Sequence, residues 1–179
     1  MNRKTLDSLI SYVGLALSAL LIVAGGLAYW GYSFANESVK DQLVAQQIYF
    51  PEDGETFTAE EFPTIHQWAG QQVDSGDKAE GYANYYIKAH LNAMAGGKTY
   101  SQVSAEWIAG GRVDEELGAL RQSLFMGETL RGLLLNAYAF WQIGQIALIA
   151  TIACFAGAAV LLLLSVLGFR HAKAVAESA

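Results

Sequence analysis

The sequence contains few cysteines, few prolines and few charged residues. Among its 179 residues there are one cysteine, Cys154, and two prolines. A single cysteine cannot form an internal disulfide, so any domain in this chain must fold by core packing alone. Cys154 also lies within an apolar run, where we expect a small hydrophobic residue and not a nucleophile.

Charged residues are also scarce, and they are unevenly placed. They make up 16% of the chain, against 53% hydrophobic residues. Residues 31–142 hold fifteen acidic and seven basic side chains, whereas the two ends hold four basic and two acidic ones. An acidic centre argues against nucleic acid as a partner, because binding to phosphates needs a basic surface. It indicates a solvated central domain.

Two long runs carry no charge at all. Leu9–Phe34 reads LISYVGLALSALLIVAGGLAYWGYSF, and Ile143–Phe169 reads IGQIALIATIACFAGAAVLLLLSVLGF. A helix rises about 1.5 Å per residue, so either run can cross a hydrocarbon core of roughly 30 Å. We predict transmembrane helices over residues 9–34 and 141–169. For the first run a cleaved signal is the alternative, since Ser33-Phe34-Ala35 resembles a cleavage site, but the length of the run favours a retained anchor.

Basic residues that flank the two runs predict the orientation. They are Arg3, Lys4, Arg170 and Lys173. The positive-inside tendency places residues 1–8 and 170–179 in the cytoplasm and residues ~36–140 outside the cell membrane. Aromatic residues at the ends of the runs that adjoin the central domain agree with an outer interface: Tyr29, Trp30, Tyr32, Phe34, Tyr138, Phe140 and Trp141.

Each run also has a face of small residues at helical spacing. In the first run these residues are Gly14, Ser18, Gly25 and Ala28, and in the second they are Ala150, Ala153 and Gly157. Small side chains let helix backbones approach closely in lipid. The two faces either pack on each other or meet a partner protein, and the sequence leaves both alternatives open.

The central segment shows helical spacing of apolar residues and no regular alternation. We therefore predict an all-α membrane protein, with two transmembrane helices flanking an extracytoplasmic α-helical domain over residues 35–140. Expected helices are a continuation of the first span to about residue 48, then 63–73, 75–95, 100–109, and one from about residue 114 into the second span.

Several short signals set the ends of these helices. Pro51 is expected to stop the first helix. Thr58-Ala59-Glu60-Glu61 fits a capping box ahead of the helix that begins at Pro63. Asp74 or Ser75 is expected to cap the next helix, which Gly96-Gly97 would end as a glycine C-cap. Gly110-Gly111 would close the helix after it.

No motif in the sequence indicates a catalytic site. Gly96-Gly97-Lys98-Thr99 resembles the end of a phosphate-binding loop, but Asn92 stands where the pattern needs glycine, so we interpret it as a helix stop and a helix start. His66 and His90, with Glu60 or Glu61, could form a two-histidine, one-acid metal set, although no dense ligand spacing supports one. We expect no catalytic, cofactor-binding or metal-binding residues and no cofactor.

The most suggestive polar pair is Glu128 and Arg131, which stand three residues apart on a predicted helix. Such a pair can form an ion pair across one turn, worth a few tenths of a kcal/mol. Its place just above the predicted outer interface makes it a candidate contact with the membrane or a neighbouring subunit. A solvated surface pair is the alternative.

Three stretches resemble a family of small actinobacterial membrane proteins. They are AGQQVDSGDKAEGYANYYIKAHL (69–91), AGGKTYSQVSAEW (95–107) and LRQSLFMGETLRGLLLNAY (120–138), and the similarity extends over nearly the whole chain. The resemblance implies a bacterial cell-envelope protein with two spans and a helical outer domain. Some members of the family are labelled aromatic ring-opening dioxygenases. That chemistry would need an iron site, for which His66 with His90 is the only conceivable start.

Taken together, the sequence predicts a non-enzymatic protein of the cell membrane whose partners are lipid and other membrane protein subunits. The leading hypothesis is an accessory or assembly subunit of a larger cell-envelope complex, with a respiratory complex as one candidate. The alternative is an extracytoplasmic ligand-binding or sensing module, which a deep pocket lined by the tyrosines of residues 82–86 would favour. The weakest alternative is a metal-dependent enzyme that uses His66 and His90.

Overall fold

The computed structural model describes residues 3–54 and 56–177, and these residues form an all-α protein without β-strands. Residues 1, 2, 178 and 179, which belong to the predicted terminal segments 1–8 and 170–179, lie outside the described residues. The helices in chain order are α1 (Arg3–Gln46), the 3-10 helix η1 (His66–Trp68), α2 (Gly76–Gly81), the π-helix η2 (Tyr82–Ile87), α3 (Lys88–Ala95), α4 (Tyr100–Ala109) and α5 (Glu115–Glu177).

Two of these helices are long and apolar enough to cross a membrane. They span Lys4–Gln46 within α1 and Glu115–Ala174 within α5. The chain divides into two compact units, one of Met1–Phe34 with Ile143–Ala179, and one of Ala35–Gln142. The predicted boundaries of the membrane spans stay predictions, because a division by compactness does not locate a bilayer.

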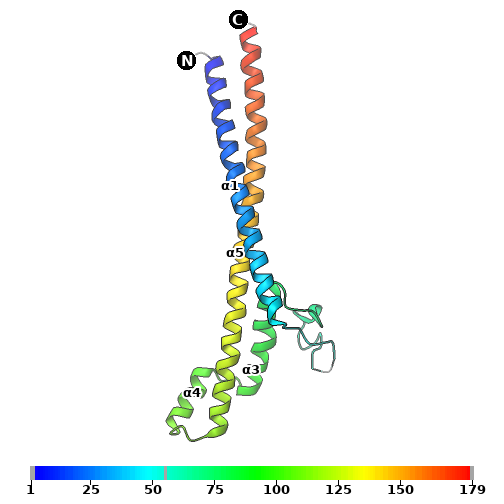
Figure 1. The fold of residues 1–179 in the computed structure, drawn as a ribbon, viewed down its shortest axis with the longest axis vertical. Coiled ribbons are helices and arrows are strands. Elements are labelled where there is room, and N and C mark those ends of the chain that lie inside the picture. Colours follow the sequence, from blue (N-terminus) through cyan, green and yellow to red (C-terminus); the bar gives the residue numbers. More distant parts are fainter. Residues whose placement is uncertain (1–2, 55, 178–179) are drawn as a thin grey trace. The chain divides into compact units, whose positions relative to one another are not determined.

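The first unit is a pair of helices that run side by side. It holds the blue part of α1 and the orange and red part of α5 (Figure 1). Residues buried along α1 recur every seven positions, at Ser11, Ser18 and Gly25, and the same spacing relates Thr151, Ala158, Ser165 and Ala172 on α5. A seven-residue repeat keeps one face of each helix in contact with its neighbour, as in a left-handed coiled coil.

The second unit contains two hydrophobic clusters. In the larger cluster, Val39 and Leu43 of α1 pack with Leu134 of α5 and with residues of the irregular segment that precedes α2, which are Phe50, Phe57, Phe62, Ile65 and Val73. In the smaller cluster, Leu91 and Ala95 of α3 pack with Val103 of α4 and Leu124 of α5. Arg121 links α5 to α4 through polar contacts. Its guanidinium lies 5.0 Å from the centroid of the Trp107 ring and donates to Tyr100 Oη at 3.0 Å.

The predicted helix over residues 63–73 is wrong. The structure has only one 3-10 turn there, at residues 66–68, and beyond it the N–H groups of Gly70 and Val73 bond to a distant segment instead of continuing the helix. The N–H of Val73 donates to the Ile48 carbonyl at 2.9 Å, and that of Gly70 donates to the Pro51 carbonyl at 3.0 Å. Thr58 does accept from the N–H of Glu61 at 3.2 Å, as a capping box requires, but no helix follows it.

Other predicted boundaries need smaller corrections. The first helix ends at Gln46, two residues before the expected end near Ile48 and before Pro51 is reached, since Gln47 adopts a left-handed backbone with φ of 53°. Ser75 occupies the N-cap position of α2, but its hydroxyl bonds to the Asp77 carboxylate and caps no backbone N–H. The predicted helix over 75–95 is present, although its middle is the π-helix η2, which the sequence did not indicate.

Candidate functional site

The helix pair of the first unit has an inverted distribution of side chains. Its buried positions hold small and hydroxyl-bearing residues: Ser11, Ser18, Thr151, Ala158 and Ser165. Large apolar residues face outward instead, for example Leu20 at 65% and Ile149 at 68% exposure. A helix pair that places its large apolar residues outside and its small residues inside matches the packing of helices in lipid.

The buried hydroxyls are satisfied without water. Ser18 Oγ donates across the helix pair to the Ala158 carbonyl at 2.9 Å, and Thr151 Oγ1 donates to the Ala147 carbonyl, also at 2.9 Å. Ser165 Oγ donates to the Leu161 carbonyl at 2.7 Å. Each hydroxyl therefore donates a hydrogen bond to a helix carbonyl. Such bonds satisfy Ser and Thr side chains where no solvent is present.

Close approach of the two backbones explains why glycine occupies several positions in this pair. A Cβ added at Gly14 would collide with Ser165 Oγ, and one at Gly168 would collide with Ser11 Oγ. Near the other end of the pair, a Cβ at Gly25 would lie 3.2 Å from Cys154 Cβ. Each of these glycines is thus matched to a specific side chain of the opposite helix.

The predicted small-residue faces are placed differently on the two helices. On α1, Ser18 and Gly25 are buried against α5, while Gly14 and Ala28 are half-buried. On α5, Gly157 is half-buried and a Cβ there would lie 3.2 Å from Leu21 Cδ1, but Ala150 and Ala153 are exposed. The predicted α5 face is therefore turned away from the line of residues 151, 158 and 165 that meets α1, and its outer part remains uncovered.

Glu128 and Arg131 form the ion pair that their spacing suggests, with 2.7 Å between Glu128 Oε2 and an Arg131 terminal nitrogen. Arg131 is not a solvated surface residue, because only 16% of its side chain is exposed. Its Nε donates to the Ala83 carbonyl of η2 at 3.0 Å, and another nitrogen donates to Asn84 Oδ1 at 3.2 Å. The guanidinium thus ties α5 to the π-helix, and its role as an interface residue stays a prediction.

The histidines are each held by local partners. His66 Nε2 lies 2.9 Å from Asp53 Oδ1, His90 Nδ1 donates to the Tyr86 carbonyl at 2.9 Å, and His171 Nδ1 lies 3.0 Å from Asp7 Oδ2. Within residues 3–54 and 56–177, no three His, Cys, Asp or Glu side chains gather in a way that could hold a metal ion. Lys98 of the phosphate-loop-like motif pairs with Glu106 at 2.8 Å.

The tyrosines of η2 belong to an aromatic core. Tyr82 lies 5.2 Å from the Phe50 ring and 4.9 Å from Tyr86, and Tyr86 lies 6.0 Å from Phe57 between ring centroids. Burial raises the pKa of the Tyr82 hydroxyl above its usual 10.0, and the nearby Tyr86 adds to the rise. Neither tyrosine lines the cavity described next.

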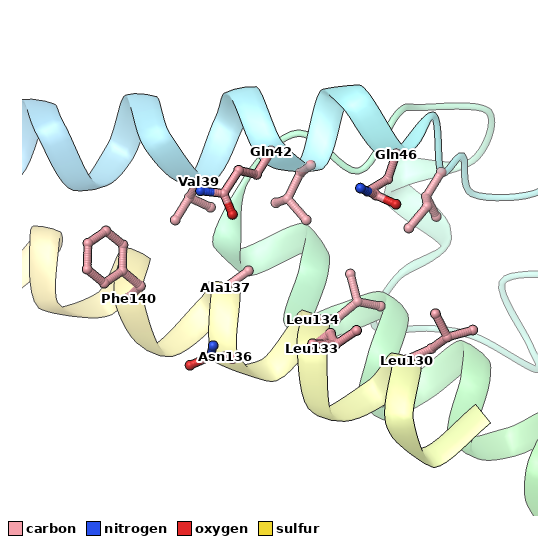
Figure 2. Close-up of a pocket in the computed structure, with 11 residues that line it drawn as sticks. Val39, Gln42, Gln46, Leu130, Leu133, Leu134, Asn136, Ala137 and Phe140 are labelled. Atoms are coloured by element: carbon pink, nitrogen blue, oxygen red, sulfur yellow. The ribbon is translucent and has the colours of Figure 1, made fainter. Parts of the chain in front are cut away.

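The second unit has a cavity of about 450 Å³ between the C-terminal part of α1 and α5. Eight apolar residues line it: Val39, Leu43, Ile48, Leu130, Leu133, Leu134, Ala137 and Phe140. Three residues with amide side chains complete the lining: Gln42, Gln46 and Asn136. Figure 2 shows Gln42 and Gln46 reaching from α1 toward α5, and Asn136 on the side of α5 turned away from α1. No charged residue from the described part of the chain lines this cavity.

Compared with known proteins, the sequence matches no family model, no curated protein and no solved structure. The resemblance to actinobacterial membrane proteins therefore stays a prediction. Sequence reasoning did not identify the cavity, because its two walls lie about 90 residues apart in the chain. The seven-residue repeat of small residues was, in contrast, a readable signal: residues 11, 18 and 25, and residues 151, 158, 165 and 172.

Proposed function

We propose that this protein is a two-pass protein of the bacterial cell membrane that acts as a non-enzymatic accessory or assembly subunit of a larger envelope complex. The observation that carries the membrane assignment is the inverted helix pair, whose outer surface is apolar and whose interior holds hydroxyls and small residues. In water such an outer surface would be a large exposed apolar patch, whereas in lipid it is the favoured arrangement.

The accessory role rests on the part of the small-residue face that α1 leaves uncovered. Ala150 and Ala153 of α5 are exposed, and they adjoin Gly157 at helical spacing. Helices in lipid associate by close backbone packing at such positions, because lipid tails compete equally well for large apolar side chains. The proposed occupant of this face is a transmembrane helix of another subunit, of which a respiratory complex is one candidate source.

A pair of variants tests this role. Ala153→Leu fills the face and should reduce the size of the complex on native gels after gentle detergent extraction. Ala159→Leu makes the same change on an exposed alanine nine residues from Ala150, which is two and a half turns and therefore the opposite side of α5. The control variant should leave the complex intact. Equal complex size for wild type and both variants would contradict the proposed face.

A ligand-binding role is the second candidate, and the cavity of the second unit favours it. The metal-dependent alternative has less support, because His66 and His90 are each engaged by a local hydrogen bond. Iron or zinc present in stoichiometric amount in the purified protein would revive that alternative.

A further inference from the structure

The cavity between α1 and α5 has the size and the lining of a ligand site. Its volume of about 450 Å³ falls within the range of roughly 300–1,000 Å³ that small-molecule sites occupy. Val39, Leu43 and Leu134 are each less than 8% exposed and belong to the larger hydrophobic cluster, so this side of the cavity is fixed by the core. Leu130 and Leu133 form an exposed part of its wall, at 53% and 62%.

The volume of the cavity limits the size of its occupant. Two turns of an α-helix, about 11 Å long and ~10 Å across, already fill roughly 850 Å³, which exceeds the cavity. A peptide helix is therefore too large to lie within the cavity. A single hydrocarbon chain meets the dimensions and would cover the exposed leucines, and each buried methylene contributes about 0.8 kcal/mol.

The occupant also has to be uncharged. Within residues 3–54 and 56–177 no acidic or basic side chain lines the cavity, and Arg131, which adjoins Leu130 in the sequence, is engaged by Ala83, Asn84 and Glu128. A charged headgroup placed there would lose its hydration without gaining a partner. The amides of Gln42 and Gln46 point toward the cavity and make no side-chain hydrogen bond to another described residue, so they can bind a carbonyl or hydroxyl.

We infer that this cavity binds an uncharged lipid, whose apolar chain lies against Leu130, Leu133 and Leu134 and whose carbonyl or hydroxyl group bonds to Gln42 and Gln46. The location fits such a ligand, because the lining includes Phe140, one of the aromatic residues expected at the outer interface, so one end of the cavity adjoins the expected membrane surface. This inference rests on the proposed membrane location, since a bilayer is the source of the lipid.

Photolabelling of the full chain in phosphatidylcholine vesicles tests the inference. The probe is a monoacylglycerol with a diazirine in its acyl chain, and the comparison is a lysophosphatidylglycerol with the same chain and a negative headgroup. The uncharged probe should label peptides containing residues 39–48 and 130–140 at least about fivefold more than the anionic probe, or ~1 kcal/mol. Equal labelling of these peptides by the two probes would overturn the inference.

Two variants locate the site. Ala137→Trp fills the cavity and should reduce labelling of these peptides about tenfold, whereas Ala119→Trp, on an exposed part of α5 outside the cavity, should not. Gln42→Leu with Gln46→Leu should reduce labelling by the uncharged probe about fivefold. Unchanged labelling in both the Ala137→Trp and the glutamine variants would show that the probe lies elsewhere. Circular dichroism checks that each variant is folded.

Failure of this inference is separable from failure of the membrane proposal. Residues 9–28 and 146–167 should be labelled by both probes if they contact lipid. Absence of label in the cavity peptides overturns the lipid site, whatever the spans show. Absence of label in the spans overturns the membrane location, whatever the cavity peptides show.

Discussion

Gly76 and Gly132 show how the space around a single residue decides what a substitution does. Gly76, the first residue of α2, is buried, and a Cβ there would collide with Cβ and Cγ of Trp141. Gly132 lies in α5 with no atom within 4 Å of an added Cβ. The two glycines are alike in the sequence, but only one of them is required by packing.

Replacing each glycine by alanine should therefore have opposite effects. Gly76→Ala should lower the free energy of unfolding by about 1–3 kcal/mol, because the Trp141 atoms near the new methyl group are fixed to the backbone of α5. Gly132→Ala should raise it by about 0.5–1 kcal/mol, because alanine loses less conformational freedom in a helix. Chemical denaturation of the detergent-solubilised protein, followed by tryptophan fluorescence, measures both. A stable Gly76→Ala protein would show that α2 does not pack closely on Trp141.

At the scale of elements, helix ends were more predictable than the segment between α1 and α2. Gly96, in a left-handed conformation with φ of 57°, ends α3 as its glycine predicts, and α4 has the expected bounds of residues 100–109. Thr99 and Gln102 form a complete capping box for α4, with the Thr99 N–H donating to Gln102 Oε1 at 2.8 Å. These features are local, so a few neighbouring residues determine them.

The capping box predicts a measurable contribution from one hydroxyl. Thr99→Ala should lower the free energy of unfolding by about 1 kcal/mol, because it leaves the N–H of Gln102 without its acceptor. Ser101→Ala removes a hydroxyl from an exposed position in the first turn of the same helix and should change stability by less than about 0.5 kcal/mol. Thermal unfolding followed by circular dichroism compares the two variants. Equal losses would indicate that α4 is not stabilised by its cap.

At the scale of the whole molecule, single introduced cysteines test the proposed topology. Cys154 is the single cysteine, so Cys154→Ala gives a cysteine-free background. In intact cells a membrane-impermeant maleimide should label a cysteine introduced by Ser101→Cys, and should label one introduced by Lys173→Cys only after the membrane is opened. The reverse pattern would invert the proposed topology. Labelling at both positions in intact cells would contradict two spans.

The sequence by itself determined the helical class, the two long apolar helices and most helix ends, because these depend on hydropathy, length and local capping. The tertiary structure decided the rest. Only packing showed that residues 70–73 bond to residues 48–51 and so form no helix, that the half-buried Arg131 bonds to η2, and which face of α5 meets α1. In a charge-free run with small residues on several sides, hydropathy does not distinguish one face from another. Which face becomes buried is therefore determined by packing against the neighbouring helix. The cavity likewise exists only where α1 and α5 lie side by side.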